Sequence, residues 1–331
     1  MQNDQNSLND IGVVIIGRNE GDRLVHCLKS LITQTSQIVY VDSASTDDSV
    51  HNAHNLGAKV LSLDMSIPFT AARARNEGFE LMRKLYPQTD YAQFVDGDCE
   101  MTTGWLASAK NFLATHQDVA VACGRRRERY PERSVYNMLC DMEWNTPVGE
   151  AKACGGDALI RVCAFEEVRG YRPSLIAGEE PELCVRLRAA GWRIWRLDIE
   201  MALHDAAMIR FGQWWKRTLR TGYAFAEGAH LHGAPPERHW VMEARRALIW
   251  GLCIPVLAVS LSFSIGLWGL TMLLVYPLQI IRLALRGTKS TKENWWRALF
   301  LVLGKFPEAI GQLKFFYISH TGRTSRLIEY K

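Results

Sequence analysis

Short apolar runs alternate with longer amphipathic segments over the first two hundred residues. The runs at 11–16, 37–43, 58–63, 91–98 and 119–124 are rich in Val and other strand formers, which is typical of buried strands. Between these runs, apolar side chains recur every three or four positions, as on one face of a helix, over residues 21–34, 45–57, 70–86 and 103–116. This order predicts an α/β fold, with a Rossmann-like, mostly parallel sheet and helices on both faces.

The alternation is lost from residue 125 onward. Residues 125–163 are polar and charged, and Pro131 and Pro147 interrupt them. The four arginines near the start of this segment favour a solvated loop, with a phosphate contact as the alternative. A further helix is predicted over 179–192, and residues 193–206 predict one or two short strands.

A long uncharged stretch follows in the last third of the chain. Residues 247–281 carry no charged side chain, which is too long for one straight membrane span of ~20 residues. Pro255 lies inside the stretch, as does a serine-rich break. We therefore expect a hydrophobic membrane hairpin over 247–283, with one or two spans; a buried helical hairpin of a soluble protein is the alternative. Basic residues lie on both flanks, at Arg245, Arg246, Arg282 and Arg286.

These flanking charges predict the side of the membrane on which the chain lies. Basic residues at both ends favour the cytoplasmic face of the inner (plasma) membrane. Residues 209–246 are expected to form amphipathic interfacial helices, because tryptophans there lie beside basic residues. One face of the first such helix carries Phe211, Trp214, Trp215, Thr218 and Gly222.

The tail after the hairpin is basic, and composition adds little else. From Arg282 to the end there are ten Lys or Arg residues against three acidic ones, within a chain of 331 residues and net charge +4. We expect residues 284–331 to be a basic amphipathic tail that meets an anionic membrane surface and not a nucleic acid. The eight cysteines show no Cys-x-x-Cys pair and the first residues are polar, so reduced thiols in the cytosol are expected.

Polar side chains gather where the predicted strands end. Asn19 and Glu20 follow the first strand, Asp42 follows the second, and Asp96 and Asp98 follow the fourth. In open α/β sheets, ligands bind at the carboxyl ends of the strands. Two carboxylates separated by one residue suit Mg²⁺, which takes one or two carboxylates together with substrate phosphates. A solvated acidic turn is the alternative for an isolated Asp-x-Asp.

Several motifs in order resemble a known family. The stretches GRNEGDRL, VDSASTDDS, ARARNEGFE and VDGD, followed by GGDALIRV, AGEEPELC and ALHD, are similar to the family 2 glycosyltransferases with the GT-A fold. The resemblance covers about residues 11–205, so residues 1–208 are expected to form a GT-A catalytic domain. It implies a sugar donor activated by a nucleoside diphosphate, of the UDP or GDP type.

The resemblance also implies a role for each donor-side residue. The nucleobase and ribose would lie against Asp42 and the segment after the first strand, and Arg75 would face the donor. From the residues alone, Asp42 also fits a helix-start acid, and Arg75 an ion pair on the protein surface. The implied donor site consists of Gly17, Arg18, Asn19, Glu20, Asp42, Arg75 and Asp96.

The Asp-x-Asp pair would hold a divalent metal, Mn²⁺ or Mg²⁺. Asp98 would be the direct ligand, and Asp96 would bind the ribose or a metal-bound water. His204 would complete the ligand set, since neutral imidazole binds Mn²⁺; a purely structural histidine is the alternative. The metal would neutralise the departing diphosphate.

The family places its general base in an acidic pair at a helix start, which here reads Glu179-Glu180. Glu180 is the expected base and Glu179 the second candidate, although the family more often has Asp at the second position. Gly155, Gly156 and Asp157 would shape the acceptor side, or simply form a turn.

Together these features predict an inverting, metal-dependent glycosyltransferase that acts on an acceptor hydroxyl. The hydrophobic hairpin favours a lipid-linked saccharide as acceptor, in surface or exopolysaccharide synthesis. A polyprenyl-phosphate sugar synthase is the main alternative, because its acceptor is already an anion and needs no base. A sugar nucleotidyltransferase would show a different glycine-rich loop, and an inactive GT-A scaffold would show a broken Asp-x-Asp.

Overall fold

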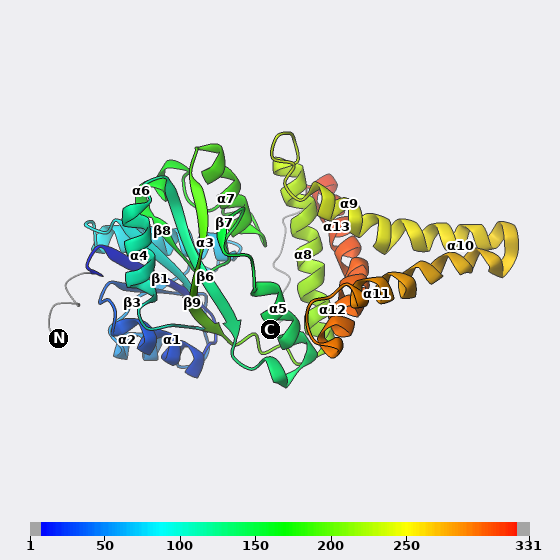
Figure 1. The fold of residues 1–331 in the computed structure, drawn as a ribbon. Helices are drawn as coiled ribbons and strands as arrows, with labels where there is room; N and C mark the ends of the chain where they lie inside the picture. Colours follow the sequence, from blue (N-terminus) through cyan, green and yellow to red (C-terminus); the bar gives the residue numbers. More distant parts are fainter. Residues whose placement is uncertain (1–7, 323–331) are drawn as a thin grey trace. The chain divides into compact units, whose positions relative to one another are not determined.

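The computed structural model of the chain describes residues 8–322 (Figure 1). The chain divides into two compact units, Met1–Pro131 with Cys140–Ala207 and Glu132–Leu139 with Met208–Lys331. The first unit is built on one sheet and the second consists of helices. Residues 1–7 of the predicted catalytic domain and 323–331 of the predicted basic tail lie outside the described residues.

The sheet of the first unit confirms the predicted α/β fold. Its strands follow the order β3-β2-β1-β4-β8-β6-β9-β5, and β7 pairs with β9. Strands β1 to β4 are mutually parallel, whereas β8 runs antiparallel to both β4 and β6. The strands are β1 (Ile11–Gly17), β2 (Ile38–Asp42), β3 (Lys59–Ser62), β4 (Tyr91–Asp96), β5 (Cys99–Met101), β6 (Val119–Glu128), β7 (Gly149–Ala151), β8 (Ala158–Arg161) and β9 (Arg193–His204).

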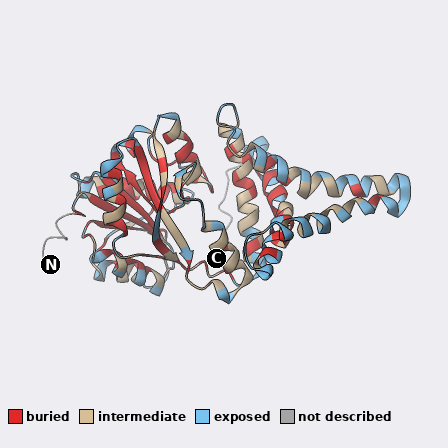
Figure 2. Cartoon of the chain, viewed as in Figure 1, coloured by how far each residue is buried: buried red, intermediate tan, exposed pale blue. Residues whose placement is uncertain are grey.

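Helices cover the sheet where the periodicity predicts them. The helices of this unit are α1 (Asp22–Ile32), α2 (Ser49–Asn55), α3 (Ala71–Leu85), α4 (Trp105–Thr115), α6 (Val162–Glu167) and α7 (Glu179–Ala189). The side chain of Thr70 caps α3 by accepting from the Arg73 amide. A Cβ at Gly78 would lie 2.5 Å from Val14, so this glycine lets α3 pack directly onto β1. The core of the sheet and its covering helices is buried throughout (Figure 2).

Two segments differ from the sequence-based expectation. Residues 193–206 are predicted as one or two short strands, and Arg193–His204 of them form the single twelve-residue strand β9. Residues 125–163 are more regular than their polarity predicts: β6 continues to Glu128, and α5 (Val135–Trp144) follows. Charged residues are tolerated in β6 because partners neutralise them, as where Arg127 lies 2.7 Å from Glu200 of β9.

The second unit packs two of its helices through glycines. A Cβ at Gly222 of α8 (Phe211–His232) would lie 2.1 Å from the Glu308 carbonyl oxygen of α13 (Lys305–Thr321). A Cβ at Gly311 would come as close to the backbone of α8. Trp214 is buried and its ring lies 4.7 Å from that of Phe300 in α12 (Thr291–Leu303). Trp214 and Gly222, expected to face lipid headgroups, thus contact protein instead, because the neighbouring helices cover this face.

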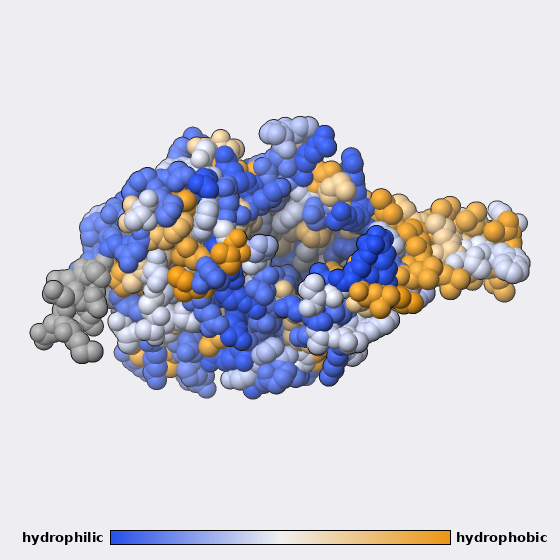
Figure 3. Space-filling model, viewed as in Figure 1, coloured by the Kyte–Doolittle hydropathy of each residue, from blue (hydrophilic) through white to orange (hydrophobic). Residues whose placement is uncertain are grey.

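The uncharged stretch forms a helical hairpin with exposed apolar side chains. The run Val241–Leu285 is long and apolar enough to cross a membrane by length and composition, and an 18-residue stretch within it has a mean hydropathy of 2.2. The chain reverses at Gly266, where φ is +66°, and Figure 3 shows apolar residues over most of the visible face of the hairpin, with paler residues near its free end. The hairpin comprises α9 (Val241–Leu248), the π-helical η3 (Ile249–Cys253), α10 (Ile254–Ile265), the 3-10 helix η4 (Gly266–Leu274) and α11 (Val275–Leu285).

The close packing of α8 on α13 gives a first prediction. Gly222→Ala forces the added methyl group against the Glu308 backbone, so we expect unfolding to cost about 1–3 kcal/mol less than in the parent. Gly212→Ala, on the same helix, adds its methyl group to open space and should be neutral or stabilising by up to about 1 kcal/mol. Thermal unfolding of the purified chain in detergent measures both. Equal stability of the two variants would contradict the packing.

Candidate active site

The carboxyl ends of three strands bring the predicted site residues together. Gly17 of β1 pairs in register with Asp42 of β2, and Ile16 pairs with Asp96 of β4. The side chain of Asp96 is 28% exposed. Asp98 follows after one glycine and is almost fully buried. The ends of these strands therefore form one polar edge, as the sequence predicts.

Arg75 of α3 is the hub of this edge. Its guanidinium lies 2.8 Å from Asp96, 2.9 Å from Glu179 and 3.1 Å from Glu180. The side chain is 3% exposed, and its Cζ lies 5.6 Å from the ring centre of Tyr171. The surface ion pair considered as its alternative is absent for this residue, because Arg75 points into the protein. The expected contact of Arg75 with the nucleotide-sugar donor stays a prediction.

The shared guanidinium divides the carboxylates into two kinds. Burial and the neighbouring Glu179 together raise the pKa of Glu180 to about 7, because Arg75 offsets them only in part. Burial acts in the same direction on Asp96, but the guanidiniums of Arg75 and Arg126 prevail and hold its pKa below the ordinary value. Asp96 is therefore a stable anion, whereas Glu180 can gain or release a proton near neutral pH.

A second buried ion pair, between Arg126 and Asp157, contacts the backbone of Asp96. Asp157 is fully buried, lies 2.6 Å from Arg126, and accepts a hydrogen bond of 3.0 Å from the Asp96 amide. Its side chain therefore points into the core. The contribution of its backbone to the acceptor side stays a prediction.

The two glycines before Asp157 differ in their surroundings. A Cβ at Gly156 would lie 2.7 Å from Arg75, 2.9 Å from Asp96 and 3.1 Å from Glu180, whereas one at Gly155 would meet nothing within 4 Å. The absence of a side chain at Gly156 therefore lets Arg75, Asp96 and Glu180 come together there, whereas a side chain at Gly155 would meet no neighbour.

Two overlapping groups among the described residues could hold a metal, and Asp98 and His204 belong to one of them; the other consists of Asp96, Cys99 and Asp157. Nε2 of His204 lies 3.3 Å from Oδ1 of Asp98, and the Cys99 sulfur completes a group whose ligand atoms are within 4.8 Å of one another. Both polar side chains are buried, and carboxylate plus imidazole suits Mn²⁺. The ring of Trp144 packs edge-on against His204 at 4.7 Å and so fixes its orientation. These residues fit a divalent cation.

The remaining donor-side residues form a turn beside β1. The side chain of Asn19 accepts from the Thr46 amide at 2.7 Å, with φ of +55° at Asn19. Glu20 is paired with Arg23 at 2.8 Å. Asp42 is buried and accepts from the Ser45 amide at 3.0 Å. Helix α2 begins only at Ser49, with Asp48 at its N-cap, so the helix-start alternative for Asp42 is not met. Direct donor contacts of Gly17, Arg18, Asn19, Glu20 and Asp42 stay predictions.

Two residues of this site escaped the sequence analysis. Arg126 belongs to an arginine cluster for which a solvated loop was favoured, yet it lies inside the site and 5.4 Å from the ring centre of Trp144. Trp144 lies in a segment without clear periodicity. The only signal in the sequence was the clustering of four arginines, which does not distinguish a buried arginine from an exposed one.

Comparison with known proteins places this geometry in a family. Residues 12–169 match the family model Glycosyl transferase family 2. The succinoglycan biosynthesis protein ExoA of Rhizobium meliloti is 27% identical over 177 residues, 51% of this chain and 54% of the relative. An uncharacterized glycosyltransferase of Rickettsia typhi is 43% identical over 51 residues, 15% of this chain and 18% of the relative. The chain thus covers about half of ExoA and less than a fifth of the second relative.

A solved structure shows the same fold. The mannosyltransferase PcManGT from Pyrobaculum calidifontis, in complex with GDP-Man and Mn²⁺, is similar with a TM-score of 0.62 and 19% sequence identity. The similarity covers 92% of this chain and 87% of the other. At this identity the likeness concerns the fold, and it confirms the GT-A fold expected from the sequence.

The position of Gly156 gives a prediction that a binding assay without the acceptor substrate can test. Gly156→Ala pushes Arg75 away from its carboxylates, so we expect the binding of Mn²⁺ with a nucleoside diphosphate to weaken about tenfold or more. Gly155→Ala is the matched control, because its methyl group enters open space. Isothermal titration with MnCl₂ plus UDP or GDP measures both variants. Equal affinities would show that the cluster does not depend on this close approach.

The pKa of Glu180 predicts how stability depends on pH. Between pH 4.5 and about 7 the folded chain keeps a proton on Glu180 that the unfolded chain has lost, so this group's contribution to stability falls as the pH rises. Over that window the loss is at most about 3 kcal/mol. Glu180→Gln should flatten this part of the profile, measured as melting temperature against pH. An unchanged slope in the variant would assign the pH dependence to other groups.

Proposed function

The chain belongs to glycosyl transferase family 2, and on this premise we propose that it transfers a sugar from a nucleoside-diphosphate donor to an acceptor hydroxyl with inversion. The observation that carries the proposal is the cluster of Glu179 and Glu180 around Arg75, at the strand edge that also holds Asp96 and Asp98. Direct displacement needs a base on one side of the sugar and charge neutralisation on the other. This edge offers both kinds of residue.

Glu180 is the proposed general base. A base works best when its pKa lies near the operating pH. Burial and the neighbouring Glu179 raise the pKa of Glu180 to about 7. Glu180 would accept the proton of the acceptor hydroxyl as that oxygen attacks the sugar. Glu179 is less suited, because its side chain is 5% exposed and it lies closer to Arg75.

Asp98 and His204 are the proposed ligands of a divalent cation, Mn²⁺ or Mg²⁺. When bound, the cation would supply positive charge to the departing diphosphate. The PcManGT structure, which holds GDP-Man and Mn²⁺, supports a donor of the UDP or GDP type and this metal class. Asp96, kept anionic by two arginines, would accept from a ribose hydroxyl or a metal-bound water.

The proposed acceptor is a lipid-linked saccharide at the cytoplasmic face of the inner membrane. The exposed apolar hairpin supports membrane association, since apolar patches of this size on a soluble surface promote aggregation. The likeness to ExoA, a succinoglycan biosynthesis protein, supports a role in exopolysaccharide synthesis. A polyprenyl phosphate acceptor would need no base, and the near-neutral pKa of Glu180 favours a hydroxyl acceptor over it.

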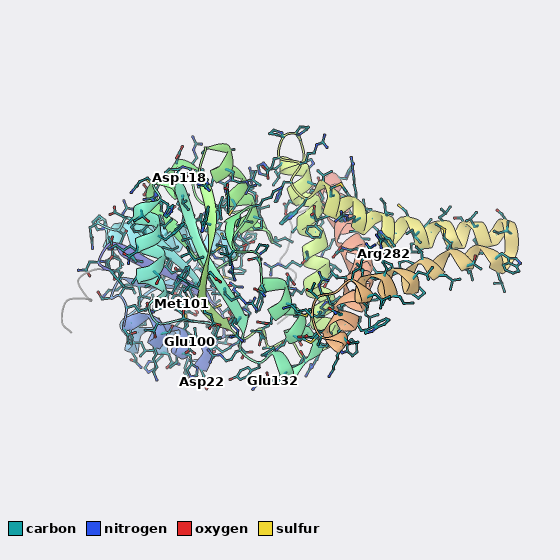
Figure 4. All side chains as sticks on the ribbon, in the orientation of Figure 1. Asp22, Glu100, Met101, Asp118, Glu132 and Arg282 are labelled. Atoms are coloured by element: carbon teal, nitrogen blue, oxygen red, sulfur yellow. The ribbon has the colours of Figure 1, made fainter. Side chains whose placement is uncertain are left out.

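A donor screen tests the activity itself. Purified chain with MnCl₂ or MgCl₂ should release nucleoside diphosphate from at least one UDP- or GDP-sugar. Asp98→Ala should lower the rate by about 10²-fold or more, because it removes a carboxylate from the cation site. Asp22→Ala, which alters an exposed residue of α1 labelled in Figure 4, is the control and should match the parent. Parental rates in the Asp98 variant would refute the assignment.

The role of Glu180 has its own test. Glu180→Gln should lower transfer to a hydroxyl acceptor by about 10²–10⁴-fold while the affinity for the donor is kept. In the parent, kcat/KM should rise with pH and level off above about 7, because only the ionised carboxylate accepts a proton. Full activity of Glu180→Gln with a polyprenyl phosphate would instead identify the chain as a polyprenyl-phosphate sugar synthase.

A further inference from the structure

The reversal at Gly266 determines how the hairpin can sit in a bilayer. Resting on the membrane association proposed above and going beyond it, we infer that the hairpin crosses the bilayer completely and twice. Its Gly266 turn then lies in the far headgroup layer, and its two basic ends lie in the near one. Three independent features of the second unit carry this inference: arm length, the polar groups of the turn, and the distribution of charge.

The two arms have the length of the hydrocarbon layer. Residues 247–265 are nineteen, and at ~1.5 Å per helical residue they extend about 28 Å. Residues 266–281 are sixteen, of which nine lie in a 3-10 helix that rises ~2.0 Å per residue, so they also extend about 28 Å. The hydrocarbon layer is ~30 Å thick. A hairpin that dips in and returns from mid-bilayer needs only half this length.

The backbone of the turn cannot remain in hydrocarbon. Gly266 ends α10 with φ of +66° and ψ of −158°. The last carbonyls of an α-helix have no partner within that helix and need one from outside it. Each unsatisfied backbone group costs several kcal/mol in lipid. No part of residues 8–322 covers this turn: Phe263 is 87% exposed and Leu267 is 81% exposed. Headgroups and water are therefore the environment that satisfies it.

The side chains near the turn suit an interface. Ser264 and Trp268 are exposed there, and tryptophan is enriched at the boundary between lipid and water. Below the turn the arms touch closely, since a Cβ at Gly269 would lie 2.4 Å from the Ser262 amide nitrogen. Small residues at such contacts are typical of helices that pair inside a membrane.

The charges lie only at the opposite end of the hairpin. Arg245 and Arg246 precede the first arm, Arg282 and Arg286 follow the second, and all four are exposed. Figure 4 labels Arg282 on the returning arm. Between them the chain carries no charge. Four guanidiniums in one layer suit the phosphates of anionic lipids and hold both ends on the same side.

A matched pair of arginine substitutions tests the depth of the turn. Val256→Arg places a charge in the middle of the first arm, where we expect membrane insertion to be lost. Leu267→Arg places the same charge at the turn, where insertion should equal that of the parent. The measurement is the fraction of full-length chain that resists alkaline carbonate extraction from membranes. A turn held at mid-bilayer would reverse the order, with Leu267→Arg the more damaging, and would overturn the inference.

Cysteine labelling locates the turn directly. The background variant replaces the exposed Cys163 and Cys253 with Ser. Ser264→Cys reports the turn and Thr288→Cys reports the end of the hairpin, each probed with a membrane-impermeant maleimide in intact spheroplasts and in inverted vesicles. We expect the two sites to react from opposite sides. Reaction from the same side, or no reaction of Ser264→Cys until detergent is added, would overturn the inference.

The outcomes separate this inference from the proposed function. Loss of nucleotide-sugar turnover with correct labelling would refute the activity and leave the topology intact. Turnover with a turn that reacts from the near side would refute the topology alone. A chain that leaves the membrane in carbonate would refute both the topology and the proposed membrane association.

Discussion

One buried guanidinium makes this site possible. Arg75 holds Asp96, Glu179 and Glu180, which come from two distant parts of the chain, within about 3 Å of a single positive charge. Without it, carboxylates ~4 Å apart would repel one another by about 4 kcal/mol at the effective dielectric constant of such a region. The pairing therefore ties α3, the end of β4 and the start of α7 together, and Gly156 supplies the space in which they meet.

The site is nevertheless left with an excess of negative charge. Among the described residues, Asp96, Asp157, Glu179 and Glu180 are four carboxyl groups in contact with two cations, Arg75 and Arg126. Part of the difference is met by the proton that Glu180 keeps up to about pH 7. The rest favours a divalent cation at Asp98. The proposed base and the proposed metal site would thus have one origin, an incompletely neutralised cluster.

The sequence predicted this site where a local pattern carries the information. Apolar runs ended by Asp42, Asp96 and Asp98 specify parallel strands with carboxylates at one edge, and the structure places them there. Contacts across long separations were not predictable. Nothing in the sequence pairs Arg126 with Asp157, thirty-one positions away, and the same holds for the continuation of β6 through charged residues, which depends on partners in β9. Polarity alone makes such segments resemble loops.

In the second unit, too, the apolar pattern of the sequence does not predict which parts of the structure contact each other. Hydrophobic residues on α8 predict a buried face, but they do not tell whether lipid or protein covers it. In the structure, α13 lies directly against Gly222, so protein covers this part of the face. In the hairpin, the length of the uncharged stretch allows either one dip or two crossings. The position of Gly266 decides between them, since a turn must satisfy its backbone groups and hydrocarbon offers no partner. For a membrane hairpin, the place where the helix breaks is thus more informative than the number of apolar residues.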